Sequence, residues 1–153
     1  MNKFIILGSG SSLGVPRIDG NFGNCNPNEP KNYRTRCCAY FKFNNLNFLI
    51  DASPDLRTQL ISNKIKDIDH VFFTHAHADQ CHGINDLRAF YIKYRKKLNV
   101  HADPTTKKHL FSSFSYCFKS KPGYPAILKM NILKKKYTFA SNKKKLIIEP
   151  IMT

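Results

Sequence analysis

The stretch IDHVFFTHAHADQCHG, residues 68–83, decides the fold of this chain. It opens with β-branched and aromatic residues, which favour a strand over 68–74. His75, His77 and Asp79 follow at intervals of two residues, so their side chains project to the same side of an extended backbone. Imidazole nitrogens combined with a carboxylate oxygen suit Zn²⁺, Mn²⁺ or Fe²⁺. The stretch therefore predicts a metal site directly after a strand.

Further strands are predicted on both sides of this segment. Residues 3–7 (KFIIL) form the first candidate, and residues 37–52 predict a hairpin around an Asn-Asn pair that tolerates positive φ. A short strand is expected over 99–102. The closing segment, 132–151, predicts two more strands around a turn that contains asparagine.

Predicted helices alternate with these strands. Ser53 can cap a helix that runs to about residue 61, because Pro54 suits the first helical position and Asp55 suits the positive end of the helix dipole. Asp103-Pro104 repeats that signal before a helix to about Phe114. Asn85 is the expected start of a helix through residue 95. Alternating strands and capped helices predict an α/β fold.

A glycine-rich segment, GSGSSLG at residues 8–14, follows the first strand. A dinucleotide-binding turn also begins with G-x-G, but here the third glycine, Gly14, comes one residue late. The next residues, VPRIDGNFG, cannot open a helix. We therefore expect a loop over 15–36 and no dinucleotide site.

The formal charge of +15 would favour an anionic partner. However, only 6 of the 25 basic residues are arginine, and lysine, asparagine and isoleucine abound, as an A/T-rich genome produces without selection for binding. We interpret Lys134–Lys136 and Lys143–Lys145 as solvated faces of strands or a turn, because few aromatic residues lie between them to stack on bases. We expect no nucleic-acid partner.

The apolar runs of the chain are too short to cross a bilayer, and the first residues do not resemble a secretion signal. The 5 cysteines have no framework spacing and suit reduced thiols in the cytoplasm. We therefore expect a cytoplasmic protein with no membrane partner. His70, His101 and His109 are expected to be ordinary core or surface histidines.

The histidine segment resembles the H-x-H-x-D-H motif of the metallo-β-lactamase superfamily. Asp51 in FLIDAS matches the aspartate that ends an earlier strand there. Four further segments resemble the branch related to the phosphonate-pathway cyclic phosphodiesterase: GSGSSLGVPR at 8–17, NYRTRCCAY at 32–40, DLR at 55–57 and HGINDLRAF at 82–90. The resemblance implies the amino-terminal half of an αββα sandwich, with residues 1–153 as one truncated domain.

The resemblance also implies a metal-dependent, phosphodiesterase-like hydrolase that uses Zn or Mn on a small phosphoester. His75 and His77 would hold a first metal, and Asp79 would hold a second and orient the attacking water as the catalytic residue. The last histidine of the motif is replaced by Gln80, a poor zinc ligand. His82 is the candidate replacement ligand; a role facing the substrate is the alternative.

In the family, another histidine, a bridging aspartate and a final histidine come from the second half of the chain. No histidine follows His109 here, and no aspartate follows Asp103. We therefore expect an amino-terminal fragment that is weak or inactive alone. The alternatives are a non-catalytic relic, half of a split protein whose carboxy-terminal half is separately encoded, or an RNA-processing nuclease of the same superfamily. Some relatives bind a structural zinc through amino-terminal cysteines; for Cys25, Cys37 and Cys38 we expect free thiols.

Overall fold

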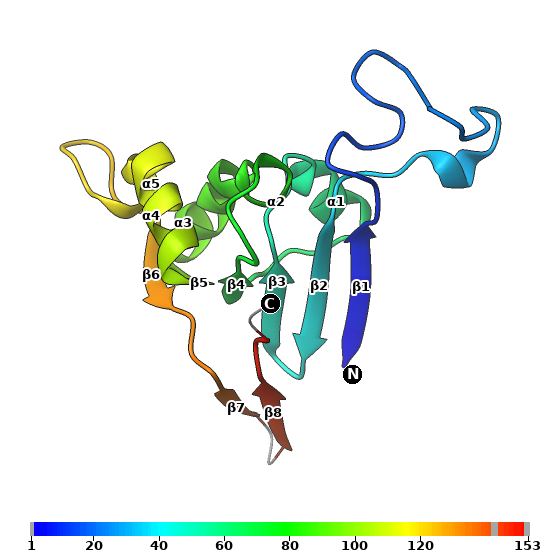
Figure 1. The fold of residues 1–153 in the computed structure, drawn as a ribbon. Coiled ribbons are helices and arrows are strands. Elements are labelled where there is room, and N and C mark those ends of the chain that lie inside the picture. Colours follow the sequence, from blue (N-terminus) through cyan, green and yellow to red (C-terminus); the bar gives the residue numbers. More distant parts are fainter. Residues whose placement is uncertain (1, 142–143, 152–153) are drawn as a thin grey trace.

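A six-stranded sheet forms the centre of the molecule (Figure 1), in the order β1-β2-β3-β4-β5-β6. The computed structural model describes residues 2–141 and 144–151. The strands β1, β2 and β3 pair antiparallel, whereas β3, β4, β5 and β6 pair parallel. Their bounds are β1 Lys3–Gly8, β2 Cys38–Phe43, β3 Leu46–Ile50, β4 His70–Phe72, β5 Leu98–Ala102 and β6 Leu128–Ile132.

Helical segments connect the parallel strands, as parallel pairing requires. They are α1 Leu56–Ser62, α2 Ala78–Cys81, the 3-10 turn η2 Ile84–Leu87, α3 Arg88–Tyr94, α4 Pro104–Ser113 and α5 Ser115–Phe118, with a further 3-10 turn, η1 Pro30–Asn32, in the amino-terminal loop. Within the described residues, no helix has the length and apolar character that crossing a membrane would need.

One face of the sheet is covered by these helices. Leu49, Val71 and Val100 of the central strands pack there against Leu56 of α1 and Leu87 of η2, and all five side chains are fully buried. Alternate strand residues point to this face because successive side chains of a strand alternate. The expectation that the helices near 54–62 and 85–95 share one face is confirmed.

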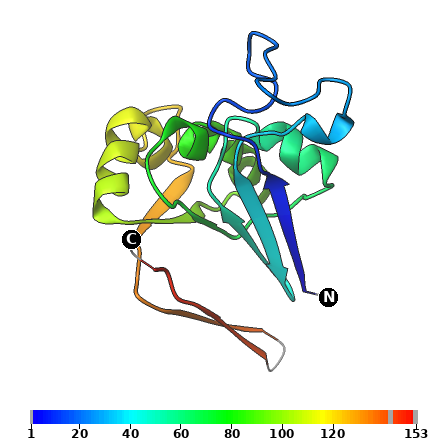
Figure 2. The same ribbon diagram turned by 45° about the vertical axis from the view of Figure 1, so that its right-hand side comes forward.

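The opposite face carries a smaller apolar cluster under a separate hairpin. The strands β7 (Tyr137–Ser141) and β8 (Lys144–Ile148) pair antiparallel and lie below the main sheet in Figures 1 and 2. Tyr137 of this hairpin packs with Phe43, Phe48 and Phe72 of the sheet. The molecule therefore has a helical layer, a six-stranded sheet and a two-stranded second sheet, in agreement with the predicted half of a sandwich.

One edge of the sheet gathers several strand ends. Because β1, β3, β4, β5 and β6 run in the same direction, their carboxyl ends meet there, together with the start of the antiparallel β2. The loop 9–37 rises above this edge in Figure 1. The histidine segment that follows β4 leaves the sheet at the same edge. We refer to it below as the upper edge.

Two details of the predicted elements are corrected. The strand β6 was not expected, although Leu128, Met130 and Ile132 alternate with polar residues, which is the pattern of a strand. The strand predicted over 68–74 is shorter, because only His70–Phe72 pair with both neighbours. The two strands expected at the end of the chain are β7 and β8, and part of the predicted turn between them lies outside the described residues.

The predicted helix starts are confirmed in one case and revised in two. Asp103 accepts hydrogen bonds from the backbone N–H groups of Thr105 and Thr106, so it caps α4 as expected. Asn85 does not cap; a 3-10 turn precedes α3, and the Asn85 side chain accepts a hydrogen bond from Tyr116. Ser53 accepts from the backbone N–H of Asp55, one residue before the helix itself begins.

Candidate metal centre

Backbone hydrogen bonds join the end of β3 to the histidine segment. The N–H of Asp51 donates to Phe72 O, the N–H of Ala52 to Gln80 O, and the N–H of Gly83 to Ala52 O, at 2.7–2.8 Å. A Cβ atom on Gly83 would lie 2.0 Å from the carbonyl oxygen of Ser53. Only glycine permits this close approach, so Gly83 fixes the segment against β3.

Asp51 holds the start of the histidine segment through Thr74. Its two carboxylate oxygens accept hydrogen bonds from the backbone N–H of Thr74 at 2.7 Å and from the Thr74 hydroxyl at 2.8 Å. Asp51 adopts φ of +62°, a left-handed conformation that is costly for a residue other than glycine. Asp51, the aspartate that the resemblance singled out, thus supports Thr74, the residue before His75.

This arrangement selects the tautomer of His75. Thr74 Oγ1 lies 3.0 Å from His75 Nδ1. Because the single hydroxyl proton of Thr74 goes to the Asp51 carboxylate, Thr74 Oγ1 accepts from a protonated Nδ1 of His75. The other nitrogen of His75, Nε2, then carries a lone pair instead of a proton, which is the state that binds metals.

His75 and His77 lie side by side at this edge. His75 Nε2 is 3.1 Å from His77 Nδ1, and the ring centroids are 4.6 Å apart. Two nitrogens bound to one tetrahedral zinc at ~2.0–2.1 Å would lie roughly 3.3 Å apart. A divalent ion between the two rings would therefore replace the shared proton with little movement, so the pair fits one metal ion.

The other two predicted ligands do not join this pair. Asp79 accepts a hydrogen bond from the amide of Gln80 at 2.8 Å, and the exposed His82 packs edge-on against Phe114, with ring centroids 5.4 Å apart. Within 2–141 and 144–151, no three His, Cys, Asp or Glu side chains are grouped to hold a metal ion. The expected convergence is therefore met by the two histidines alone, and the ligand roles of Asp79 and His82 stay predictions.

Burial shifts the pKa values of two groups near the histidine pair. Burial raises the pKa of Asp51 to about 6, opposed by the hydrogen bonds from Thr74 and reinforced by the charge of Asp79. The same desolvation raises the pKa of the neighbouring Cys81 to about 11. The Cys81 thiol is therefore neutral at physiological pH, and thiols bind metals as thiolates.

The remaining histidines behave as expected. His101 is buried, with its two ring nitrogens 3.0 Å from His70 Nδ1 and 3.2 Å from the Tyr137 hydroxyl. His109 is exposed on α4. All the cysteines of the chain are free thiols.

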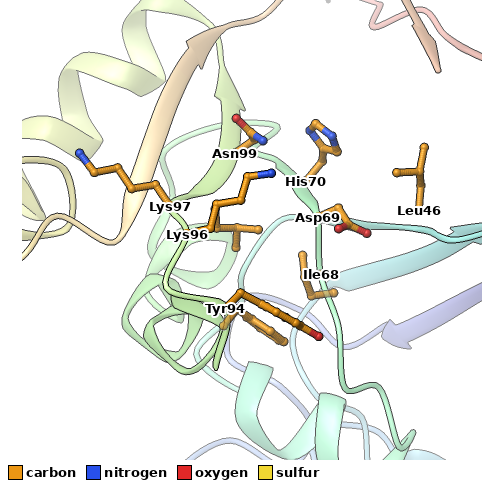
Figure 3. Close-up of a pocket in the computed structure, with 10 residues that line it drawn as sticks. Leu46, Ile68, Asp69, His70, Tyr94, Lys96, Lys97 and Asn99 are labelled. Carbon is orange, nitrogen blue, oxygen red and sulfur yellow. The ribbon is translucent and has the colours of Figure 1, made fainter. Parts of the chain in front are cut away.

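A further cavity lies at the other edge of the sheet. It has a volume of about 440 Å³ and is lined at the beginnings of β3, β4 and β5 by Leu46, His70 and Leu98, with Lys96 and Lys97 on its wall (Figure 3). The histidine pair lies beyond the opposite ends of these strands. This cavity therefore does not belong to the candidate metal centre.

The fold and the paired histidines agree with a match to a known family. A family model described as a beta-lactamase superfamily domain matches residues 46–151, more than half of the chain. The chain belongs to the beta-lactamase superfamily. The matched range contains Asp51 and the whole histidine segment.

Individual proteins match nearly the whole chain but extend well beyond it, so the chain spans about half or less of their length. The crystal structure of a diphosphatase of the PhnP family is 27% identical, with a TM-score of 0.77, and the match covers 92% of this chain and 54% of that one. Zn²⁺-bound PqqB of Methylobacterium extorquens is 19% identical, with a TM-score of 0.64, over 91% of this chain and 51% of that one. A protein named octanoyltransferase from Porphyromonas gingivalis is 30% identical over 150 residues, which are 97% of this chain and 30% of that protein.

Two residues that position the superfamily motif were not singled out from the sequence. Thr74 was assigned only to the strand, although a hydroxyl residue between a strand and H-x-H is a signal for a hydrogen bond to the histidine. Gly83 was named only as part of the segment 82–90, which carries the resemblance. Its need for close backbone approach depends on Ser53, which is distant in sequence, so no local pattern reveals it.

Proposed function

We propose that the chain is the amino-terminal part of a metal-dependent, phosphodiesterase-like hydrolase that acts on small phosphoesters. The observation that carries the proposal is the pair His75 Nε2 and His77 Nδ1, 3.1 Å apart beyond the end of β4. The likeness to a diphosphatase at 27% identity supports a phosphoester substrate. Zn or Mn held there would lower the pKa of a water molecule and polarise a phosphoryl oxygen.

The residues of this chain have distinct roles in the proposal. Asp51, through Thr74, orients His75 and keeps Nε2 unprotonated. Asp79 is the proposed second ligand and the group that orients the attacking water, once its side chain leaves the Gln80 amide. His82 is the proposed substitute for the ligand that Gln80 cannot provide.

The chain alone is proposed to be a weak or inactive catalyst. A catalytic zinc normally has three protein ligands besides water, and the described residues group only two. Because the match covers 54% of the diphosphatase chain, we propose that a carboxy-terminal half, in a longer form or separately encoded, provides the remaining ligands. Reduced thiols are consistent with the proposed cytoplasmic location.

Metal titration of the purified chain tests the proposal. We expect weak binding of Zn²⁺ or Mn²⁺ that His77→Ala abolishes and His109→Ala, an exposed histidine on α4, leaves unchanged. Hydrolysis of bis(p-nitrophenyl) phosphate should be barely detectable until a carboxy-terminal half is added. Equal metal binding by both variants would refute the site, whereas strong turnover by the chain alone would refute the need for a second half.

The same assays separate one alternative from the proposal. A non-catalytic relic would gain no activity from a complementary half, even with metal bound. The positive charge would favour an RNA-processing nuclease, but an A/T-rich genome produces such a lysine-rich composition without selection for binding. We therefore do not propose a nucleic-acid partner.

A further inference from the structure

A second cavity, of about 370 Å³, opens at the upper edge of the sheet. It is bounded by the segment after β1 and the segment before β2, and both leave the sheet at this edge. The volume is in the range of small-molecule sites. Its lining residues are Leu13, Gly14, Val15, Pro16, Ile18, Tyr33, Arg34, Thr35, Arg36 and Asp55, and we call it the arginine pocket.

The walls of the arginine pocket are built by close backbone contact. The N–H of Val15 donates to Arg34 O at 2.9 Å and the N–H of Arg34 donates to Val15 O at 2.8 Å. A Cβ atom on Gly10 would lie 2.6 Å from the carbonyl oxygen of Arg34. The glycine-rich segment that follows β1 is therefore needed to bring the two walls together.

The two arginines of the pocket differ in whether a carboxylate neutralises their charge. Arg36 forms a two-pronged ion pair with Asp55, with nitrogen–oxygen distances of 2.9 and 2.7 Å. Arg34 donates instead to neutral acceptors, Ser9 Oγ and Lys31 O, both at 3.1 Å. Among the described residues Arg34 has no carboxylate partner, so its positive charge is available to an anion.

Apolar side chains complete the pocket. Leu13 and Tyr33 are each 60% exposed, and Phe22 packs edge-on against the Tyr33 ring, with centroids 5.0 Å apart. Exposed apolar side chains around a few polar groups are typical of ligand sites. The pocket therefore combines an aromatic wall with an uncompensated guanidinium group.

The arginine pocket lies on the same side of the molecule as the histidine pair. Asp55, which holds Arg36, follows Asp51 by four residues after the end of β3. The pKa of Arg36 is raised mainly by the hydrogen bond to Asp55, and the charge of Asp79 adds to the effect. The carboxylate of Asp79, in the histidine segment, is therefore close enough for its charge to act on Arg36.

We infer that the arginine pocket binds the aromatic, anionic end of a phosphoester, with Arg34 contacting the phosphate and Tyr33 packing against the aromatic group. Arg36 is a positioning residue, because Asp55 occupies its guanidinium nitrogens and it holds the wall in place. The inference rests on the proposed function, which it deepens by naming an aryl or nucleoside phosphate as the substrate class. The proposed contacts of the ligand with Arg34 and Tyr33 require no metal ion.

Binding of phenyl phosphate to the metal-stripped chain tests the inference without catalysis. We expect amide NMR shifts at Gly14, Arg34 and Thr35, and binding about tenfold or more tighter than that of inorganic phosphate. Arg34→Gln should weaken phenyl phosphate binding by about tenfold or more, because it removes a charge-assisted hydrogen bond. Tyr33→Ala should weaken phenyl phosphate but not inorganic phosphate.

Arg57→Gln is the matched control, because it removes the same charge from an exposed position on α1 outside the pocket. Equal weakening by Arg34→Gln and Arg57→Gln would overturn the inference, since only net charge would then matter. Shifts confined to Lys96 and Lys97 would overturn it as well. Failure of metal binding by the histidine pair would refute the proposed function but leave this measurement unaffected.

Discussion

The two faces of the six-stranded sheet are covered to different extents. The helix-covered face buries a continuous cluster that includes Leu49, Leu56 and Val71. The hairpin face buries Phe48 and Phe72 under Tyr137 of β7. On the same side of the sheet, however, Phe4 and Ile6 of β1 remain 63% and 66% exposed.

Because of this difference, the two faces should contribute unequally to the stability of the chain. Burial of apolar area is the main stabilising contribution to a fold, so most of the stability should reside on the helix-covered face. The hairpin face instead combines a small core with the polar chain His70, His101 and Tyr137. Mutations on the two faces should therefore have unequal effects, which the following predictions test.

The largest effect is expected from Leu56→Ala on the helix-covered face. Leu56 is fully buried, and truncating such a side chain leaves a cavity that costs about 2–5 kcal/mol in the free energy of unfolding. Ile61→Ala, on the same helix but at a 61% exposed position, should cost less than about 0.5 kcal/mol. Urea denaturation of both variants measures the difference, and similar losses would show that α1 is not docked as described.

Acid should destabilise the hairpin face. Burial, followed by the charges of His70 and Lys134, lowers the pKa of His101 from 6.5 to about 4. Between these values the unfolded chain binds a proton that the folded chain does not, so stability falls as pH drops through this window. The pKa of His70, which faces Asp69 and Lys96, is lowered too, mainly by burial.

The contribution of His101 to the acid loss should reach up to about 3 kcal/mol at pH 4. Unfolding measured at pH 7 and pH 4 should show a smaller pH dependence in His101→Gln, which removes the group. His109→Gln, at an exposed position, should keep the full dependence. An unchanged pH dependence in His101→Gln would mean that the hairpin does not bury this histidine.

At the upper edge that both faces share, Asp51→Asn should reverse a hydrogen bond. The amide Nδ2 of asparagine would donate to Thr74 Oγ1, so the hydroxyl proton of Thr74 would turn to His75 Nδ1. His75 would then carry its proton on Nε2, the nitrogen expected to bind metal. Loss of such a supporting partner typically weakens metal binding about 10–100-fold.

Nitrogen NMR shifts of His75 should report the changed tautomer without any metal, and zinc titration should report the affinity. Asp86→Asn, an exposed position in η2, is the control and should change neither. If His75 keeps its tautomer in Asp51→Asn, the orienting role of Asp51 is wrong.

The sequence predicted the parts of this molecule that depend on local patterns. The hairpin around Asn44, the cap at Asp103 and the register of His75 with His77 each follow from neighbouring residues, and all are present. The strand β6 was missed because its short alternating pattern, LKMNI, competes with adjacent lysine-rich segments. Its identity becomes clear only from parallel pairing with β5.

Features that depend on distant contacts could not be read from the sequence. Asn85 looked like a helix cap, but its side chain is taken by Tyr116, thirty-one residues later. The ligand role of His82 stays a prediction, whereas the packing of Phe114 beside its ring depends on a residue distant in sequence. The glycine-rich segment before Gly14 was correctly judged not to be a dinucleotide turn, but the close packing of its glycines against Arg34 and Arg36 could not be foreseen. For Asn85 and these glycines, a tertiary partner decides the role of the residue.

The smallest stability effect is expected from Ile6→Thr on the open part of the hairpin face. Threonine keeps the β-branched shape that strands favour, and Ile6 is 66% exposed, so the free energy of unfolding should change by less than about 0.5 kcal/mol. The adjacent Ile5→Thr is the matched variant, because Ile5 packs against the helix-side cluster and should cost about 1–3 kcal/mol. Light scattering should show less self-association of Ile6→Thr, since exposed apolar surface drives aggregation. Equal losses from the two adjacent substitutions would mean that Ile6 is covered in solution, and the contrast between the two faces would then fail at β1.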